Sequence, residues 1–189
     1  MRVLDMGCGS GIIGITLALE LAKLRPEVVM ADISEAALSL ALENATALGA
    51  PVKTYRSDLF SAWQPAEDNA VVPPGGFDLV LANLPYVPDG EQVATEVTYD
   101  PATALYGGPD GLDVVRRFLK EALPHLAEGC LVLLEVGHDQ GAATCAAMAE
   151  LGYTGTRVLS DMSGKARFPM GYAPAPPVPA QPAAESDDE

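Results

Sequence analysis

The residues most suited to chemistry form the tetrapeptide Asn83-Leu84-Pro85-Tyr86, which follows the apolar run of residues 77–82. The run has the pattern of a buried strand, so the tetrapeptide is predicted to lie at a strand's carboxyl end. We predict that all four residues form a catalytic site for a flat amino group. The Asn83 side-chain oxygen and the Leu84 main-chain carbonyl would each accept one N–H, while Tyr86 packs on the flat face. This arrangement would turn the nitrogen lone pair toward a methyl donor.

A second motif is the glycine loop Asp5-Met6-Gly7-Cys8-Gly9-Ser10-Gly11, which follows the first predicted strand. Glycines between a strand and a helix let the backbone approach a ligand closely, and a helix N-terminus offers amides to an anionic group. The residues from Gly9 to Gly14 also match a dinucleotide fingerprint, so that alternative stays open. The position of Asp5 argues against it, because a fingerprint that begins at Gly9 would place this charge well inside the first strand.

Carboxylates recur at the ends of successive predicted strands. Asp5, at the end of the first, would face the cationic amino group of S-adenosylmethionine. Asp32, at the end of the second, would accept hydrogen bonds from the ribose hydroxyls, and Asp58 with Leu59, after the third, would frame the adenine. Taken singly, Asp32 or Asp58 would also suit a helix N-cap or a turn. The predicted cofactor-binding residues are Asp5, Gly7, Cys8, Gly9, Gly11, Asp32, Ile33, Asp58, Leu59 and Asn83.

Strands and helices alternate along the chain. Strands are expected at residues 3–6, 28–31, 52–56, 77–82 and 130–136, and near 156–159 and 167–170. Helices are expected at residues 11–24, 34–48, 111–126 and 140–151, with Ser34 as an N-cap, Gly49 as a stop, and Leu38, Leu42 and Ala45 at helical spacing. This order predicts an α/β, Rossmann-like fold with a mostly parallel seven-stranded sheet and helices on both faces. Residues 1–172 would form one domain, followed by a disordered, acidic Pro/Ala-rich tail at 173–189.

Composition limits the classes of function. The net charge of −15 opposes a grip on nucleic-acid phosphates. Three cysteines, Cys8, Cys130 and Cys145, lack a CxxC spacing and favour reduced thiols over a disulfide framework or a metal site. The apolar stretch of residues 12–19 is too short to cross a bilayer. We therefore expect a cytoplasmic protein with no membrane segment and no metal, in which Arg116 and Arg117 belong to a solvated helix face.

The motifs together resemble S-adenosylmethionine-dependent methyltransferases that modify a planar exocyclic amino nitrogen. The glycine loop, Asp32, residues 57–60 and the tetrapeptide carry this resemblance. Residues 100–112 and 134–141 are similar to the HemK/PrmC family, which methylates a glutamine side-chain amide in translation release factors. The similarity extends over about residues 2–171. It implies S-adenosylmethionine as cofactor and a release factor or other translation protein as partner, with a site-lining role for Glu135.

Two departures from that family keep alternatives open. The family usually has Asn-Pro-Pro-Tyr, and here Leu84 replaces the first proline. Asn-Leu-Pro-Tyr is also similar to the motif of ribosomal RNA adenine dimethylases, so a nucleic-acid adenine or guanine N-methyltransferase is a second hypothesis. The family also carries an N-terminal helical domain that helps hold the release factor, whereas this sequence starts at the first strand. A cofactor-binding module without its substrate-recognition domain is therefore a third.

Overall fold

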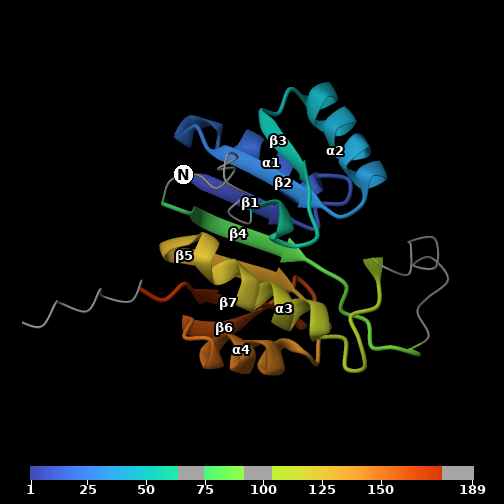
Figure 1. The fold of residues 1–189 in the computed structure, drawn as a ribbon, viewed down its shortest axis with the longest axis vertical. Coiled ribbons are helices and arrows are strands. Elements are labelled where there is room, and N and C mark those ends of the chain that lie inside the picture. The colour runs from blue at the N-terminus through green and yellow to red at the C-terminus, as the bar shows by residue number, and fades with distance from the viewer. Residues whose placement is uncertain (64–74, 92–103, 176–189) are drawn as a thin grey trace, which may run out of the picture.

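Seven strands form one sheet in the order β3-β2-β1-β4-β5-β7-β6 (Figure 1). The computed structural model describes residues 1–63, 75–91 and 104–175. All strands are parallel except β7, which runs antiparallel to both neighbours, so the prediction of a mostly parallel sheet is confirmed. The strands are β1 (Arg2–Met6), β2 (Glu27–Asp32), β3 (Val52–Arg56), β4 (Phe77–Asn83), β5 (Leu126–Glu135), β6 (Thr154–Ser160) and β7 (Ala166–Tyr172).

Helices connect most of the parallel strands. They are α1 (Ile12–Glu20), α2 (Glu35–Leu48), α3 (Asp113–Ala122) and α4 (Gly141–Glu150), with short 3-10 helices at Ala22–Leu24, Ser61–Trp63 and Leu123–His125. The predicted ends of α2 are confirmed. The Ser34 hydroxyl accepts a hydrogen bond from the Ala37 amide at 3.2 Å, and Gly49 ends the helix with a φ of 67°. A glycine adopts this left-handed conformation without the steric penalty of a Cβ atom.

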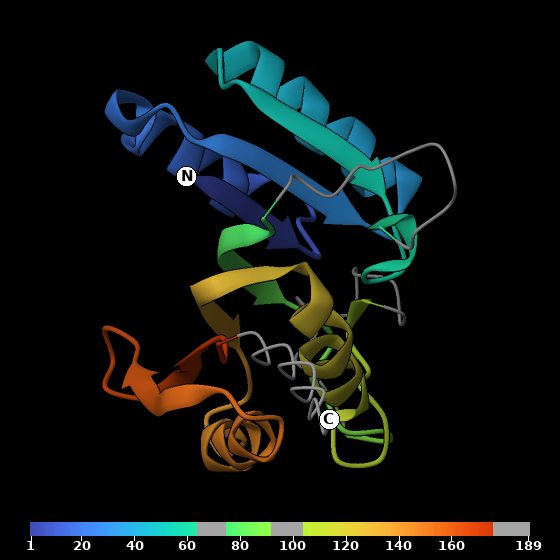
Figure 2. The same cartoon turned by 60° about the vertical axis from the view of Figure 1, so that its left-hand side comes forward.

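Side chains alternate between the two faces of the sheet and divide the core into two clusters. Val3 on β1 packs on one face with residues of α1 and α2 such as Ile15 and Ala41. Leu4, the next residue, packs on the other face with Phe118 of α3 and the rest of the larger cluster. This period of two is what a strand buried on both faces requires. Figure 2 shows the twist of the sheet between β3 and β6.

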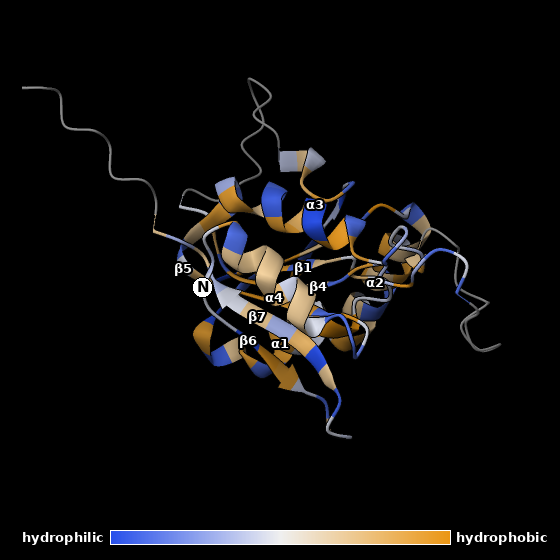
Figure 3. Ribbon diagram, turned by 90° about the horizontal axis from the view of Figure 1, so that it is seen from below, coloured by the Kyte–Doolittle hydropathy of each residue, from blue (hydrophilic) through white to orange (hydrophobic). Residues whose placement is uncertain are grey.

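Helix α3 shows how an amphipathic element seals the larger cluster. Its buried residues are Val115, Phe118, Leu119 and Ala122, while its charged residues Asp113, Arg116, Arg117 and Lys120 are exposed. Figure 3 shows this division of α3 between hydrophobic and hydrophilic residues. Spacing of three and four residues places the apolar side chains on one stripe.

Several predicted boundaries were wrong. The helix expected over residues 11–24 ends at Glu20, and a 3-10 helix follows at Ala22–Leu24. The helix expected to reach residue 126 ends at Ala122, and β5 begins at Leu126, four residues before the predicted strand. Pro124 lacks an amide donor and falls in the intervening 3-10 turn. The start of β5 contains exposed Glu128 and Gly129, so an apolar criterion misses it.

The helical spacing assigned to α2 was also partly wrong. Leu42 is 50% exposed, whereas its neighbour Ala41 is completely buried. A Cβ atom at Gly11 would lie 3.0 Å from the Cβ of Ala41, so α2 and the glycine loop approach closely at this point. The small side chain of Ala41 makes that approach possible.

Some predictions concern residues outside the described ranges. The loop expected at 64–76 is described only at its end, and the loop expected at 87–110 only on either side of residues 92–103. The tail from residue 176 onward also lies outside them, so its predicted disorder stays a prediction. Within the described ranges, no helix combines the length and apolar character needed to cross a membrane.

Candidate cofactor and acceptor site

The glycine loop and the tetrapeptide meet between β1 and β4, where the strand order of the sheet reverses. β1 and β4 are neighbours in the middle of the sheet although about 70 residues separate them in the chain. The glycine loop follows β1, and the tetrapeptide follows β4. A Cβ atom on Gly7 would lie only 2.7 Å from the main-chain oxygen of Asn83, and Gly7 has a φ of 72°. Only glycine fits this contact between the predicted cofactor and acceptor motifs.

The glycine loop is held by its own amides and by the end of β2. The amides of Gly7 and Cys8 both donate to the Ala31 carbonyl, at 2.8 and 3.0 Å. Gly11, which has no side chain to cap the helix, precedes α1, and the first turn of α1 contains no acidic residue. The amides of this first turn therefore suit an anionic group. Burial raises the pKa of the Cys8 thiol to about 12, which keeps the thiol neutral beside the loop.

Asp5 lies one residue before the end of β1, where it was expected to end the strand, and its role toward a ligand stays a prediction. It is the fourth of five strand residues and is only 1% exposed. Its Oδ2 accepts a hydrogen bond from the Gly14 amide at 2.8 Å and so anchors α1. Its Oδ1 is buried and accepts no hydrogen bond from the part of the chain that the structure describes. Burial raises the pKa of Asp5 from 3.8 to about 6, and the charge of Asp32 adds to the effect.

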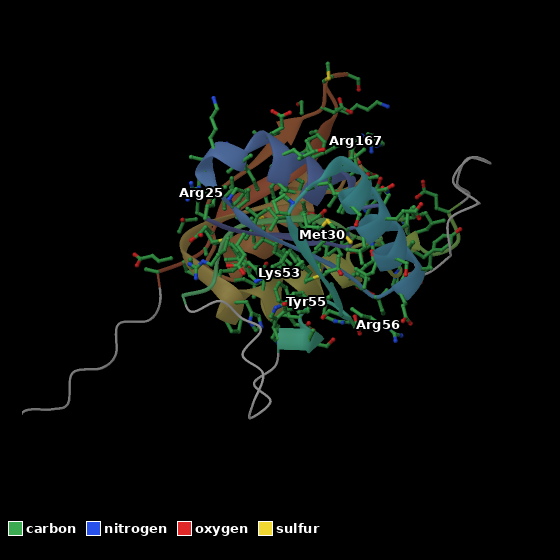
Figure 4. All side chains as sticks on the ribbon, turned by 90° about the horizontal axis from the view of Figure 1, so that it is seen from above. Arg25, Met30, Lys53, Tyr55, Arg56 and Arg167 are labelled. Atoms are coloured by element: carbon green, nitrogen blue, oxygen red, sulfur yellow. The ribbon has the colours of Figure 1, made fainter. Side chains whose placement is uncertain are left out.

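Asp32 takes the turn role that the sequence left as an alternative. Its Oδ2 accepts the Gly9 amide at 3.0 Å, and its Oδ1 accepts the Ser34 amide at 2.9 Å. Asp32 therefore ties the glycine loop to the turn before α2. Ile33 beside it is 56% exposed. Arg56, labelled at the end of β3 in Figure 4, donates to the Ile33 carbonyl at 3.3 Å.

Asp58 and Leu59 follow β3, and their predicted role in framing an adenine stays a prediction. The Leu59 side chain is 6% exposed and belongs to the larger core cluster, so its side chain is part of the protein interior. Its φ of 46° places it in a conformation that non-glycine residues seldom adopt. Asp58 is exposed and binds the guanidinium of Arg117 from α3 through Oδ1. The helix pattern predicted a solvated Arg117, whereas its guanidinium forms an ion pair with Asp58.

Asn83 is the last residue of β4 and pairs in register with Glu135, the last residue of β5. Its Nδ2 donates to Glu135 Oε2 across 3.4 Å. Because a carboxylate can only accept, this neighbour fixes which end of the Asn83 amide faces β5. The Asn83 Oδ1 then points away from the Glu135 carboxylate. Neither this oxygen nor the Leu84 carbonyl accepts a hydrogen bond from residues of the described ranges.

The other members of the tetrapeptide are anchored by their neighbours. The Leu84 side chain is 6% exposed and packs in the core, and its Cδ2 would lie 3.2 Å from a Cβ on Gly7. Tyr86 is half-buried. Burial, followed by the charge of Glu135, raises the pKa of its phenol, and the positive charge of Arg167 on β7 partly offsets this rise. Tyr86 is therefore neutral at physiological pH.

Gln140 is a buried polar residue that the sequence reasoning did not select. It is 8% exposed and its side chain bonds the carbonyls of Tyr86 and Asp110, at 2.8 and 3.0 Å. The only signal for it was its place in residues 134–141, which carried the family resemblance. In the described part of the chain, no three His, Cys, Asp or Glu residues are arranged to hold a metal ion.

This arrangement of sheet, glycine loop and strand-end amide defines a Rossmann-like methyltransferase fold. The chain superposes on a methyltransferase from Pyrococcus furiosus with a TM-score of 0.63 and 20% identity, covering 92% of this chain and 75% of that one. It also superposes on a ribosomal protein L11 methylase from Lactobacillus delbrueckii subsp. bulgaricus, with a TM-score of 0.57, 22% identity and coverage of 90% and 67%. These likenesses confirm the predicted fold.

The sequence model of the methyltransferase small domain family matches residues 1–108, and the chain belongs to this family. Release factor glutamine methyltransferases from Neisseria gonorrhoeae and Deinococcus radiodurans are 36% and 37% identical to it over 90% and 88% of this chain. The predicted resemblance is thus confirmed. The chain spans 60% and 56% of the length of these two relatives.

Proposed function

We propose that this chain carries out S-adenosylmethionine-dependent methylation of a glutamine side-chain amide in a translation release factor or a related protein. The observation that carries the proposal is the contact between Gly7 and Asn83, which joins the cofactor loop to an amide-bearing strand end at the middle of the sheet. The release factor glutamine methyltransferases that resemble the chain support the same acceptor. A cytoplasmic location belongs to the proposal.

The described residues fit S-adenosylmethionine. The buried Asp5 Oδ1 would be satisfied by a cationic amino group. The first turn of α1, whose Gly14 amide is bonded to Asp5, offers its remaining amides to a carboxylate. Asp32 uses one lone pair on each oxygen for the protein backbone, so further lone pairs suit ribose hydroxyls. Exposed Ile33 offers an apolar surface to an adenine. When bound, the cofactor would supply a methyl group on a positively charged sulfur.

The role of the chain's own residues is to aim a weak nucleophile. An amide nitrogen delocalises its lone pair into the carbonyl, so deprotonation alone would not direct it. Asn83 Oδ1 and the Leu84 carbonyl would accept its two N–H groups. Their acceptor capacity is not used by the residues of the described ranges. Two fixed acceptors define the plane of the amide and point the lone pair along one direction.

The substitution of leucine for the usual first proline is compatible with this role. The acceptor in position 84 is a main-chain carbonyl, which does not depend on the side chain. The Leu84 side chain packs in the core against Gly7, so burial restrains a backbone that a proline would otherwise stiffen. We expect a loss of preorganisation of only about 0.4–1 kcal/mol relative to proline.

The proposal is tested with labelled S-adenosylmethionine and two acceptors offered separately, a release factor and ribosomal RNA. Label in the release factor that is lost on replacing its acceptor glutamine by alanine is expected. The Leu84 form of the tetrapeptide is what favours a nucleobase acceptor, and label on RNA alone would overturn the proposal. Cofactor binding in calorimetry without transfer to any acceptor would instead identify a binding module.

A further inference from the structure

Beyond the ends of β4 and β5, the strand ladder no longer fixes the tetrapeptide. The last residue pair between these strands is Asn83 with Glu135, and both chain segments leave the sheet after it. The segment 104–112 packs directly on the exit of β4. Val87 donates to the Leu105 carbonyl and accepts from the Gly107 amide, each at 2.9 Å. The position of the tetrapeptide therefore depends on contacts made outside the sheet.

Gln140 makes those contacts from a third segment, the turn between β5 and α4. Its Nε2 donates to the Tyr86 carbonyl at 2.8 Å and to the Asp110 carbonyl at 3.0 Å. Its Oε1 accepts the Gly137 amide at 2.8 Å. Both N–H groups and the oxygen are thus used, and a reversed amide would lose all three bonds. The side chain has one compatible orientation.

The location of Gln140 in α4 makes this use of its side chain distinctive. Gln140 is the N-cap residue of α4, a position whose side chain commonly bonds its own helix. Here no side-chain cap bond is made, and the amide reaches across to residues 54 and 30 positions earlier in the chain. A buried amide that is fully bonded in this way rigidifies the segments it joins.

The tetrapeptide, segment 104–112 and Gln140 form a junction, and two glycines show that it is tightly packed. A Cβ on Gly111 would lie 2.1 Å from the main-chain oxygen of Tyr86 and 2.5 Å from Gln140 Nε2. A Cβ on Gly107 would lie 2.5 Å from the main-chain oxygen of Pro85. The carboxylate of Asp110 binds Arg116 of α3, with an Oδ2 distance of 2.6 Å. The junction is therefore tied to the sheet on one side and to α3 on the other.

We propose that Gln140 is a positioning residue of the acceptor site, which sets the Tyr86 and Leu84 main chain against segment 104–112 and so aims the acceptor amide. This inference rests on the proposed methyl transfer. Gln140 touches neither reacting group. It acts through the Tyr86 carbonyl, two residues from the Leu84 carbonyl that would hold the substrate. A displacement of about 1 Å at such a group is enough to lower a rate by up to about 100-fold.

Two variants separate the bonds of Gln140. Gln140→Met keeps the length of the side chain and removes all three bonds. Gln140→Glu keeps the acceptor for Gly137 and removes the two donors to Tyr86 and Asp110. We expect both to lower kcat by about 10- to 100-fold, with the cofactor Kd within about twofold of the wild type. Recovery of wild-type kcat by Gln140→Glu would overturn the proposal, because only the bond within the turn would then matter.

Thr144→Val is the matched control. Thr144 lies on the same helix, is 1% exposed, and its hydroxyl donates to the Gln140 main-chain carbonyl at 3.0 Å. The change removes a buried hydrogen bond in α4 without touching Tyr86 or Asp110. Its kcat should stay within about twofold of the wild type even if its stability falls as far as that of Gln140→Met. An equal loss of kcat in Thr144→Val would assign the effect to helix stability and overturn the proposal.

Amide hydrogen exchange gives a readout that needs no acceptor. In Gln140→Met, the amides of Val87, Gly107 and Asp113 should exchange faster, because their bonds join the segments that Gln140 holds. The amides of β1 and β2 should be unchanged. Unchanged exchange at Val87 and Gly107 would overturn the positioning role. Lack of transfer by the wild-type protein, with faster exchange in the variant, would count against the proposed function alone.

Discussion

The two halves of the site are built on different principles. The proposed cofactor half consists of the glycine loop (residues 5–11), Asp32 and Asp58, and its charged side chains also hold the protein together. Asp5 binds the Gly14 amide, Asp32 binds two amides, and Asp58 binds Arg117. The acceptor half consists of residues 83–86, segment 104–112, Glu135 and Gln140. Here a neutral amide holds the backbone, and the two proposed acceptor oxygens remain unused within the described ranges.

This difference implies that folding and ligand binding are coupled in the cofactor half and separable in the acceptor half. Removing a carboxylate from the first should change both the free energy of unfolding and the cofactor affinity. Removing an acceptor from the second should change the rate alone. Variants of each half can break or sharpen this contrast.

The largest effect is expected for Asn83→Ala. Losing one of two acceptors aimed at the reacting amide should lower kcat by about 100- to 1,000-fold, or about 2.7–4 kcal/mol in the activation barrier. Because Asn83 is exposed and its bond to Glu135 is long, the free energy of unfolding should change by less than about 0.5 kcal/mol. Transfer assays, calorimetry with the cofactor and urea denaturation measure the three quantities.

Asn44→Ala is the contrasting control for that variant. The Asn44 amide donates to the Ser10 carbonyl at 2.9 Å and so supports the cofactor half. We expect it to weaken cofactor binding with little change in kcat at saturating cofactor. A cofactor Kd raised as strongly in Asn83→Ala as its kcat falls would erase the separation between the halves.

Gly7→Ala tests the point where the halves touch. The alanine would have to adopt a φ of 72°, and its Cβ would lie 2.7 Å from the main-chain oxygen of Asn83. The backbone would have to move to relieve this contact. We expect a loss of about 2–4 kcal/mol in the free energy of unfolding and weaker function in both halves. Gly9→Ala is the control, because Gly9 has a φ of 53° but nothing within 4 Å of its Cβ. It should lose only about 1–2 kcal/mol, and equal losses would refute a steric contact at Gly7.

Sequence alone predicts the frame of this site well and its internal bonds poorly. Alternating apolar runs, Ser34 and Gly49 carry strong local signals, so the sheet and α2 could be predicted from them. The burial of the Leu59 side chain could not be predicted, because its place after a strand says nothing about whether the side chain enters the core. Gln140 was missed because a single glutamine has no periodic pattern. Its role arises only when segments 30 and 54 residues apart in the chain meet.

Asp5→Asn should reveal the coupling in the cofactor half through pH. The pKa of Asp5 is raised from 3.8 to about 6 by burial, so the folded protein holds a proton that the unfolded chain releases. The carboxyl therefore disfavours folding increasingly as the pH rises from about 4 to about 6, by at most about 3 kcal/mol. Without cofactor, the variant should gain stability relative to the wild type at pH 7 and not at pH 4.

The same variant should lose affinity for S-adenosylmethionine, because the cationic amino group would lose its charged partner. Urea denaturation at the two pH values and calorimetry at pH 7 measure both effects. A stability difference that is the same at pH 4 and pH 7 would show that the buried carboxylate is not the source. Unchanged cofactor affinity would remove Asp5 from the proposed binding site.

The smallest effects are expected for two neighbouring arginines of α3 that serve opposite halves. Arg117 binds Asp58, and Arg116 binds Asp110, with both guanidinium groups about half exposed. Exposed ion pairs of this kind contribute about 0–1 kcal/mol, so Arg117→Ala and Arg116→Ala should each lower the free energy of unfolding by the same small amount.

The functional effects of the two variants should differ. We expect a cofactor Kd raised by up to about fivefold in Arg117→Ala, and a kcat lowered by up to about fivefold in Arg116→Ala, because Asp110 is held next to Gln140. Both effects should shrink at high salt, and the same change of Kd and kcat in the two variants would contradict the division of the site.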